Sequence, residues 1–276
     1  MTGRQLLRRI AFAAFLGAIL VFALFPLYYA FTTSVTPSGE LFRPEIFPER
    51  WTAEHYRGIL AGAFLRNILN SALVSAAVVV LTLALALGAA YALARIRFRG
   101  RAAVLFGVLA ISMFPQIAVL AGMFELVRSF GLFDSLGALV FSYLTLTLPF
   151  AAWVLATFMH GIPIELEEAA ALDGASPLSV LLRIFVPLLQ PALAATGLLV
   201  FIAAWNEFLF ALTFTLSDES RTVPVAIALL SGASAFELPW GSIMAAAVLV
   251  TAPIVALALL FQRHIVSGLL AGAIKQ

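Results

Sequence analysis

Acidic side chains gather in one stretch of a chain that otherwise contains few of them. Of the 14 acids among 276 residues, several lie close together between His160 and Gln190: Glu165, Glu167, Glu168 and Asp173. Carboxylates can transfer protons, ligate a metal or pair with basic groups of a partner. His160 and His264 have no ligand spacing, so a metal site is not expected. The apolar segments supply no converging catalytic set, and binding of a partner is the predicted role.

Helix signals divide this stretch into two short helices. Pro163 suits a first helical turn, and the acids after it favour the positive end of the helix dipole, which predicts a helix over Ile164–Leu172. Gly174 suits the left-handed position that ends a helix. Ser176 is a candidate N-cap, and Pro177 suits the first position of the next helix. That second helix is expected to have one apolar face, formed by Leu178, Leu181, Leu182 and Phe185.

Two short helices that meet at a glycine form a compact acidic projection. Such a projection suits docking into a groove of another protein. The alternative is an amphipathic hairpin on the membrane surface, but these elements usually carry Lys and Arg on the polar face. Anionic headgroups would repel the acids here, so protein docking is favoured.

The composition indicates that lipid surrounds much of the chain. It is 63% hydrophobic and 11% charged, with a mean hydropathy of +1.08, whereas soluble domains are about half apolar and a quarter charged. The arginines cluster at the ends of apolar runs rather than on one basic face, which argues against nucleic acid as a partner. The absence of cysteine excludes disulfides and thiolate metal sites.

The elements that position the acidic stretch are therefore membrane-spanning helices. Each needs about 20 apolar residues, and six segments reach that length: Ile10–Phe31, Ser71–Ala94, Ala102–Phe124, Leu136–Met159, Leu188–Leu212 and Gly241–Gln262. We expect an all-α polytopic membrane protein with a single domain over residues 1–276. The shorter apolar run Val223–Phe236 is expected to be an interfacial or re-entrant element.

Arginine positions predict the orientation. Basic residues crowd the turn after the second span and precede the first: Arg95, Arg97, Arg99 and Arg101, and Arg4, Arg8 and Arg9. The positive-inside rule makes that side cytoplasmic and places both termini there. A cleaved signal peptide is the alternative for the first span, but its apolar run is too long. Residues 32–70 then form the main external loop, with a packed cap favoured over contact with an external partner.

The acidic stretch resembles the EAA loop of ATP-binding-cassette importer permeases. The matching positions are Glu168, Ala169 and Ala170, then Asp173, Gly174 and Ala175, then Ile184, Pro187 and Pro191. Val186 departs from the pattern, where the family usually has Leu. Runs at residues 205–212, 240–247 and 262–275 are similar to the maltose-type, carbohydrate-importing branch, so the resemblance covers nearly the whole chain.

The resemblance implies a type I importer permease fold, in a bacterial cytoplasmic membrane, that takes part in uptake of a disaccharide or oligosaccharide. The implied partners are a homologous second permease chain, two nucleotide-binding ATPase subunits, and an extracytoplasmic solute-binding protein or lipoprotein. ATP and Mg²⁺ would bind those ATPase subunits, since this chain lacks a Gly-x4-Gly-Lys-Ser/Thr loop and is expected to bind no cofactor and to be no enzyme. The coupling loop at 160–190 would seat in the ATPase, with Glu168 facing basic residues. We call the turn around Gly174, where the two short helices meet, the elbow. The C-terminal tail, with Gly272 and Lys275, would reach toward the same interface.

Polar residues inside spans are candidates for the substrate pathway because they are costly in lipid. The fifth span holds the candidates Trp205, Asn206 and Glu207. For Asn206 a hydrogen bond between helices of the permease pair is favoured over a pathway contact, and for Glu207 the alternative is a place at the membrane interface. Pro115, Gln116 and Pro149 are expected to mark helix kinks.

Other function classes stay open as alternatives. The importer could carry a solute other than a sugar. A membrane-embedded enzyme, a channel or a secondary transporter would show a catalytic set, a filter motif or inverted repeats, respectively, and we find none of these signals in the sequence.

Overall fold

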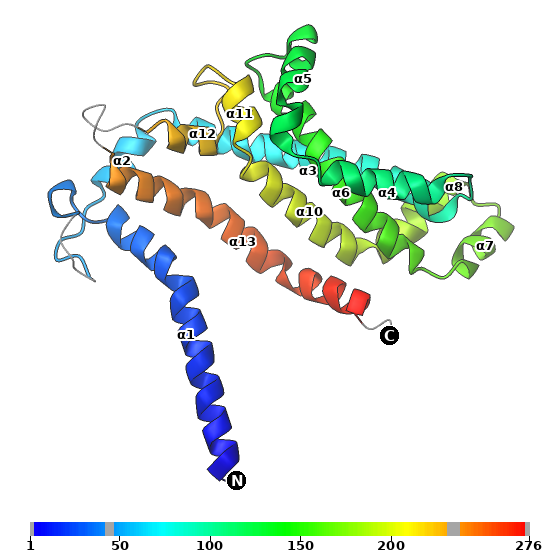
Figure 1. Ribbon diagram of the computed structural model, residues 1–276, viewed down its shortest axis with the longest axis horizontal. Coiled ribbons are helices and arrows are strands. Elements are labelled where there is room, and N and C mark those ends of the chain that lie inside the picture. The colour runs from blue at the N-terminus through cyan, green and yellow to red at the C-terminus, as the bar shows by residue number, and fades with distance from the viewer. Residues whose placement is uncertain (1–2, 42–46, 231–237, 274–276) are drawn as a thin grey trace. The chain divides into compact units, whose positions relative to one another are not determined.

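The computed structural model describes residues 3–41, 47–230 and 238–273. Within these residues all regular elements are helices, as Figure 1 shows, and the all-α prediction is confirmed. The chain forms two compact units, Met1–Leu65 with Ile227–Pro253, and Arg66–Ala226 with Ile254–Gln276. We call them unit 1 and unit 2 and describe each by itself.

Unit 1 contains α1 (Gly3–Ser34), the 3₁₀ turn η1 (Ser38–Glu40), α2 (Glu54–Leu60) and the first part of α13 (Trp240–Ala273). The segment after α1 folds back on the end of that helix, because the Ser34 and Tyr56 hydroxyls lie 2.7 Å apart and Nε2 of buried His55 lies 2.9 Å from the Thr36 carbonyl. A Cβ atom at Gly241 would collide with the His55 ring. Tyr56 and His55 thus pack against the end of α1 and the segment after it, while a cap over residues 32–70 and a contact with an external partner stay predictions.

Unit 2 holds the main core and the remaining helices. Its elements are α3 (Phe64–Arg95), α4 (Arg101–Ser112), α5 (Gln116–Ser129), α6 (Leu136–His160), α7 (Glu165–Leu172), α8 (Pro177–Val180), η2 (Leu181–Phe185), α9 (Val186–Leu188), α10 (Gln190–Trp205), α11 (Leu209–Phe214) and α12 (Val223–Ala228). Helix α6 packs against α4 and α10, and α11 packs against α5 and α6 (Figure 1). Large fully buried side chains fill the contacts: Leu139, Tyr143, Leu155, Met159, Phe185, Phe210 and Phe214.

The predicted spans agree with the helices except at two breaks. Within the part of the chain that the structure describes, four helices are long and apolar enough to cross a membrane, or up to six if each bent pair counts as one span. The third span was predicted over Ala102–Phe124 with a kink near Pro115 and Gln116, and α4 and α5 meet there at an angle of 92°. Pro115 lies at this break, where it has no N–H to continue the helix, and its prediction as a kink is confirmed. Pro149 lies within continuous α6.

The fifth span differs from its prediction at both ends. Continuous helix was expected over Leu188–Leu212, but α10 ends at Trp205 and α11 begins at Leu209. At the other end, the helix through Leu188 bends by 81° before α10. Pro191 sits in the first turn of α10, and a proline ring disfavours helical backbone in the residue before it. The short helix α12 begins at Val223, where the interfacial element was predicted; residues 231–237 of that element lie outside the described residues.

Candidate functional site

The acidic stretch forms two short helical pieces joined at a glycine, as predicted. Helix α7 ends in a Schellman motif: Ala175 N–H donates to Ala170 O at 2.9 Å, and Gly174 N–H donates to Ala171 O at 3.0 Å. Gly174 has φ +77°, which favours glycine because a Cβ atom would be strained there. Ser176 caps the next helix through a 3.3 Å bond from Ser179 N–H. The predicted elbow is therefore confirmed.

The buried face of the second piece differs from the prediction. Leu181 and Phe185 are buried, but Leu178 and Leu182 are exposed. Residues Leu181–Phe185 form a π-helical segment, whose wider turn shifts the phase of the side chains. Val180 is buried instead, so the helix presents a different face to the core than an ideal α-helix would.

The elbow presents acids and apolar side chains to solvent. Glu165, Glu168 and Asp173 are exposed, and Leu172, next to the elbow, is 90% exposed. Large exposed apolar groups beside charges typically mark a surface that binds another protein. Figure 1 shows α7 at one end of unit 2, beyond the C-terminal end of α6.

The predicted coupling residues divide between the surface and the core. Ala170 is buried, and Ala175 and Ile184 pack partly buried against the same core. Glu168, Ala169, Asp173, Gly174 and Pro187 are exposed. The arrangement leaves Glu168 free to face a partner while Ala170 anchors its helix.

A cluster that sequence reasoning missed fixes α7 to α3. Glu167 points inward, where its Oε1 accepts a 2.7 Å hydrogen bond from the Tyr91 hydroxyl and its Oε2 lies 3.7 Å from Arg95 Nε. The Arg95 side chain is only 8% exposed and lies over the Phe185 ring, 4.9 Å from its centroid. We call Tyr91, Arg95, Glu167 and Phe185 the Arg95 joint.

Arg95 also closes the end of α6. Its Nη2 donates to the Met159 carbonyl at 2.9 Å and to the Ile162 carbonyl at 2.7 Å. The last carbonyls of a helix lack intrahelical partners and carry partial negative charge, so a guanidinium is well placed there. The i, i+4 spacing of Tyr91 and Arg95 at a helix end was a signal for this cluster, but the arginine indicated only orientation.

The candidate pathway residues lie at the break between α10 and α11. Glu207 is 7% exposed, and its carboxylate accepts backbone N–H bonds from Phe210 at 2.8 Å and Ala211 at 3.1 Å, capping α11. Gln116, from the other predicted kink, donates to Glu207 Oε1 at 2.6 Å. The two helix breaks are thus tied together by one buried carboxylate.

The neighbours of Glu207 have different surroundings. Trp205 is 1% exposed and stacks on Phe201 with ring centroids 5.4 Å apart. Asn206 is exposed, and its amide donates to the Ile202 carbonyl of its own helix at 2.8 Å. Of the tail residues, Gly272 lies within α13 and Lys275 lies outside the described residues.

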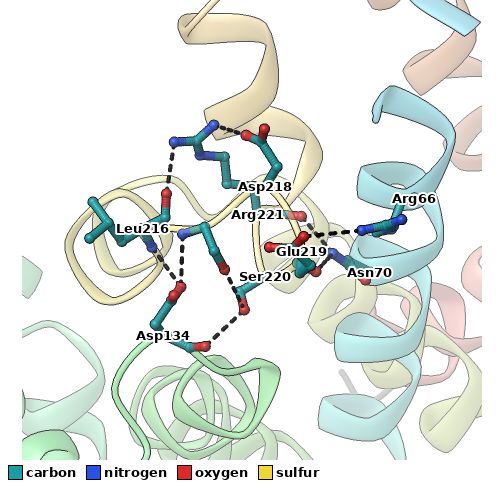
Figure 2. Close-up of polar contacts among 9 residues, drawn as sticks. Arg66, Asn70, Asp134, Leu216, Asp218, Glu219, Ser220 and Arg221 are labelled. Carbon is teal, nitrogen blue, oxygen red and sulfur yellow. Dashed lines mark hydrogen bonds and ion pairs between the residues drawn. The ribbon is translucent and has the colours of Figure 1, made fainter. Parts of the chain in front are cut away.

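At the N-terminal end of α6, Asp134 holds the segment after α11. Its Oδ1 accepts backbone N–H bonds from Leu216 at 2.7 Å and Ser217 at 3.0 Å, and Ser220 Oγ donates to its carbonyl at 2.8 Å (Figure 2). Asp134 has φ +59°. The two backbone N–H donors hold the pKa of the Asp134 carboxyl below its usual value. We call Asp134, Leu216, Ser217 and Ser220 the Asp134 turn.

The start of α3 holds the other side of the same segment. Asn70 donates its amide to the carbonyls of Glu219 at 2.7 Å and Arg221 at 2.9 Å, and Arg66 forms an exposed 3.6 Å ion pair with Glu219 (Figure 2). Arg221 pairs with Asp218 within the segment. These bonds connect α3, α6 and α11 at one end of unit 2.

Comparison with known proteins gives consistent relatives over nearly the full chain. It is 42% identical over 94% of its length to the trehalose/maltose transport system permease protein MalG of Thermococcus litoralis, covering 95% of that protein. It is 40% identical over 97% of its length to the trehalose transport system permease protein SugB of Mycobacterium tuberculosis, covering 98% of it.

Two solved structures share the fold. One is a chain from the crystal structure of a bacterial ABC transporter involved in the import of the acidic polysaccharide alginate, with a TM-score of 0.82, 23% identity, and coverage of 95% of this chain and 98% of that one. The other comes from a bacterial alginate ABC transporter in complex with an alginate pentasaccharide-bound periplasmic protein, with a TM-score of 0.68, 16% identity, and coverage of 91% and 92%. The expected type I importer permease fold is confirmed.

Residues 81–270 match the family described as binding-protein-dependent transport system inner membrane component. This range includes the Arg95 joint, the elbow and the break at Glu207. The expectation of a multi-pass transport subunit of the cytoplasmic membrane, rather than an enzyme, is confirmed by this match. The chain belongs to the family of binding-protein-dependent transport system inner membrane components.

Proposed function

We propose that this chain forms half of the transport pathway of an ATP-driven importer for a disaccharide or short oligosaccharide. The observation that carries the proposal is the elbow, where α7 ends at Gly174 with acids and Leu172 exposed. Two relatives, 42% and 40% identical to this chain, are a trehalose/maltose permease and a trehalose permease, which supports a sugar over the alternative of a non-sugar solute.

The proposed assembly contains a second, homologous permease chain, two ATPase subunits and an extracytoplasmic solute-binding protein. ATP and Mg²⁺ bind the ATPase subunits. The alginate transporter with a similar fold was solved with a periplasmic binding protein, which supports a partner of that kind here. The basic clusters around Arg95 and before α1 favour a cytoplasmic position for the elbow and for both termini.

In this proposal the exposed side of α7 docks on an ATPase subunit. Glu168 faces basic groups of that subunit, and Leu172 and Leu178 enter apolar contacts, as their exposure allows. Gly272 and Lys275 of the tail approach the same partner. Closure of the two ATPase subunits draws the elbows of the two permease chains together.

Motion of α7 reaches the bundle through its chain connections. The connector 161–164 joins α7 to α6, and residues 173–189 join it to α10. Both helices therefore tilt when the elbow moves, and the permease pair alternates between inward-facing and outward-facing states. Asn206, exposed at the end of α10, is a candidate for contact with the passing sugar or with the second permease chain. Buried Glu207 and Trp205 shape the break beside it.

The test is ATP-driven sugar uptake by the complete transporter in proteoliposomes. Gly174→Pro removes the elbow, since proline cannot adopt a positive φ, and Glu168→Lys reverses the docking charge. We expect both variants to insert and assemble but to lose sugar uptake while ATP hydrolysis continues. Glu125→Lys is the control, because Glu125 is an exposed acid on α5, a helix that lies apart from α7 in Figure 1.

Unchanged uptake in both elbow variants would overturn the coupling mechanism. Trehalose, maltose and a non-sugar solute are compared as substrates in the same vesicles. Uptake of the non-sugar solute alone would retain the importer but reject the sugar. Purification without an ATPase and a second permease chain would favour the channel or enzyme alternatives.

A further inference from the structure

Helix α3 has no chain connection to the elbow, yet it is tied to it. The chain enters α7 from α6 and leaves it toward α10. Tyr91 and Arg95, in the last turns of α3, provide the contact with α7 through Glu167. Building on the proposed function, we propose that Tyr91 and Arg95 are positioning residues that fix α3 to α7, so that α3 moves with the elbow during transport.

Arg95 contacts several moving parts at once. Its guanidinium donates to carbonyls at the end of α6 and in the following connector, and it faces Glu167 of α7 and the Phe185 ring beyond the elbow. Each contact belongs to a segment that the elbow displaces. A planar group with several fixed donors holds such an arrangement in a way that a flexible lysine ammonium does not.

Tyr91 supplies the second contact of α3. Its hydroxyl donates to the Glu167 carboxylate at 2.7 Å, and hydrogen bonds to a charged acceptor are about twice as strong as neutral ones. Its ring packs against Phe185 with centroids 5.9 Å apart. Tyr91→Phe would keep this ring contact and remove only the bond to α7, which makes it the mildest variant of the joint.

The joint separates the roles of two adjacent acids. Glu168 is exposed and available to the ATPase, whereas Glu167 faces α3. A force applied at the outer side of α7 thus passes through a single helical turn to α3. A buried ion pair adds little net stability over apolar packing, so its expected contribution is to the geometry of the moving body.

The first experiment measures ATP hydrolysed per sugar transported in the reconstituted complete transporter. Tyr91→Phe and Arg95→Gln are expected to raise this ratio, with Arg95→Gln raising it about fivefold or more, the scale of coupling between distant sites. Arg95→Lys should not restore the normal ratio. The control is Arg97→Gln, which removes an exposed arginine two residues further along and should leave the ratio unchanged.

The second experiment follows α3 directly. Cysteines for spin labelling are introduced at two exposed positions, Ile96→Cys just after α3 and Ala171→Cys on α7. The chain contains no other cysteine, so the labels attach only there when the partner chains are cysteine-free. In the otherwise unchanged chain the distance between the labels should be the same without nucleotide and with trapped ATP. With Arg95→Gln the distance should change or broaden on ATP binding.

The two experiments distinguish failure of this inference from failure of the proposed function. If the unchanged chain shows no ATP-driven sugar uptake, the proposed function fails. If it transports normally but the Arg95 and Tyr91 variants keep both the ATP ratio and the label distances, α3 does not depend on the joint and this inference is overturned. Assembly with the ATPase and the thermal unfolding of each variant are measured in parallel, and a variant that fails to assemble is replaced by Tyr91→Phe alone.

Discussion

The Arg95 joint and the Asp134 turn lie at opposite ends of α6, separated by 25 residues, or about 37 Å of helix. Each uses one charged side chain to hold two backbone groups of another segment. Arg95 does so with only 8% of its side chain exposed, while Asp134 is only partly buried. Both regions therefore use hydrogen bonds from or to a charged side chain, and they differ in how far water can reach that side chain.

Burial decides how easily such a link can open. A buried charge that loses its partner keeps its desolvation penalty, so breaking the pair is costly. A hydrated carboxylate that releases two N–H groups regains water in exchange. The elbow end of α6 is therefore built as a stiff connection, and the other end holds its segment with a link that water can replace.

The largest effect should follow charge reversal in the buried link. Arg95→Glu removes the cation from two carbonyls and places a second carboxylate beside Glu167, and we expect a loss of about 3–5 kcal/mol in the free energy of unfolding. Thermal unfolding of the purified chain in detergent, followed by fluorescence or circular dichroism, measures the change. Combining Arg95→Glu with Glu167→Arg should recover part of it.

The proposed difference between the two ends of α6 is wrong if Arg95→Glu lowers the free energy of unfolding no more than removal of the Asp134 carboxylate does. In that case water reaches the joint, and the two ends of α6 do not differ in stiffness. A double reversal that recovers nothing would show instead that the carbonyl contacts at Met159 and Ile162 carry the effect, because an arginine at 167 cannot restore them.

The sequence predicted the elbow well because its signals are local. Gly174, Ser176 and Pro177 each have a conformational preference that acts within a few residues, so helix ends and the left-handed glycine follow from the sequence alone. The six apolar segments follow from local composition in the same way, although two of them are broken in the structure. The predicted apolar face of the second helix was correct for Leu181 and Phe185 but not for Leu178 and Leu182, because the sequence does not reveal the π-helical turn at Leu181–Phe185.

Local sequence signals could not predict the contacts between segments that lie far apart in the sequence. Arg95 and Glu167 lie far apart in the sequence, and the i, i+4 spacing to Tyr91, which distinguishes Arg95 from exposed Arg97, does not point to Glu167. Likewise, Gln116 and Glu207 were both selected, one as a kink and the other as a pathway residue, but only the fold brings them within 2.6 Å. Asp134, which holds a positive φ without being glycine, was not selected at all.

Glu207 resembles both regions: like Asp134 it accepts two backbone N–H bonds, and like the Arg95 side chain it is buried. Glu207→Leu leaves the N–H groups of Phe210 and Ala211 and the Gln116 amide without an acceptor, and we expect a loss of about 2 kcal/mol in unfolding free energy. Glu207→Gln keeps an acceptor oxygen and should lose less. Detergent unfolding of both variants tests this order, and equal losses would mean that the charge alone matters.

The smallest effect is expected at the Asp134 turn, and it depends on pH. The folded pKa of Asp134 is lowered, so its stabilising effect is complete above the ordinary value of 3.8 and is lost as the pH falls through the lowered value. Hydrogen exchange at the Leu216 and Ser217 amides should therefore keep its protection from neutral pH down to about 5, and lose it only in stronger acid.

Two substitutions separate the charge of Asp134 from its backbone conformation. Asn adopts positive φ readily, so Asp134→Asn should remove the pH dependence and weaken protection of the two amides only modestly. Asp134→Ala loses the acceptor and also pays about 1 kcal/mol for the left-handed backbone, so its amides should exchange fastest. If the Asp134→Asn variant still lost protection of these amides in acid, a group other than Asp134 would be titrating. The greater access of water to Asp134 than to Arg95 would then not explain the difference between the two ends of α6.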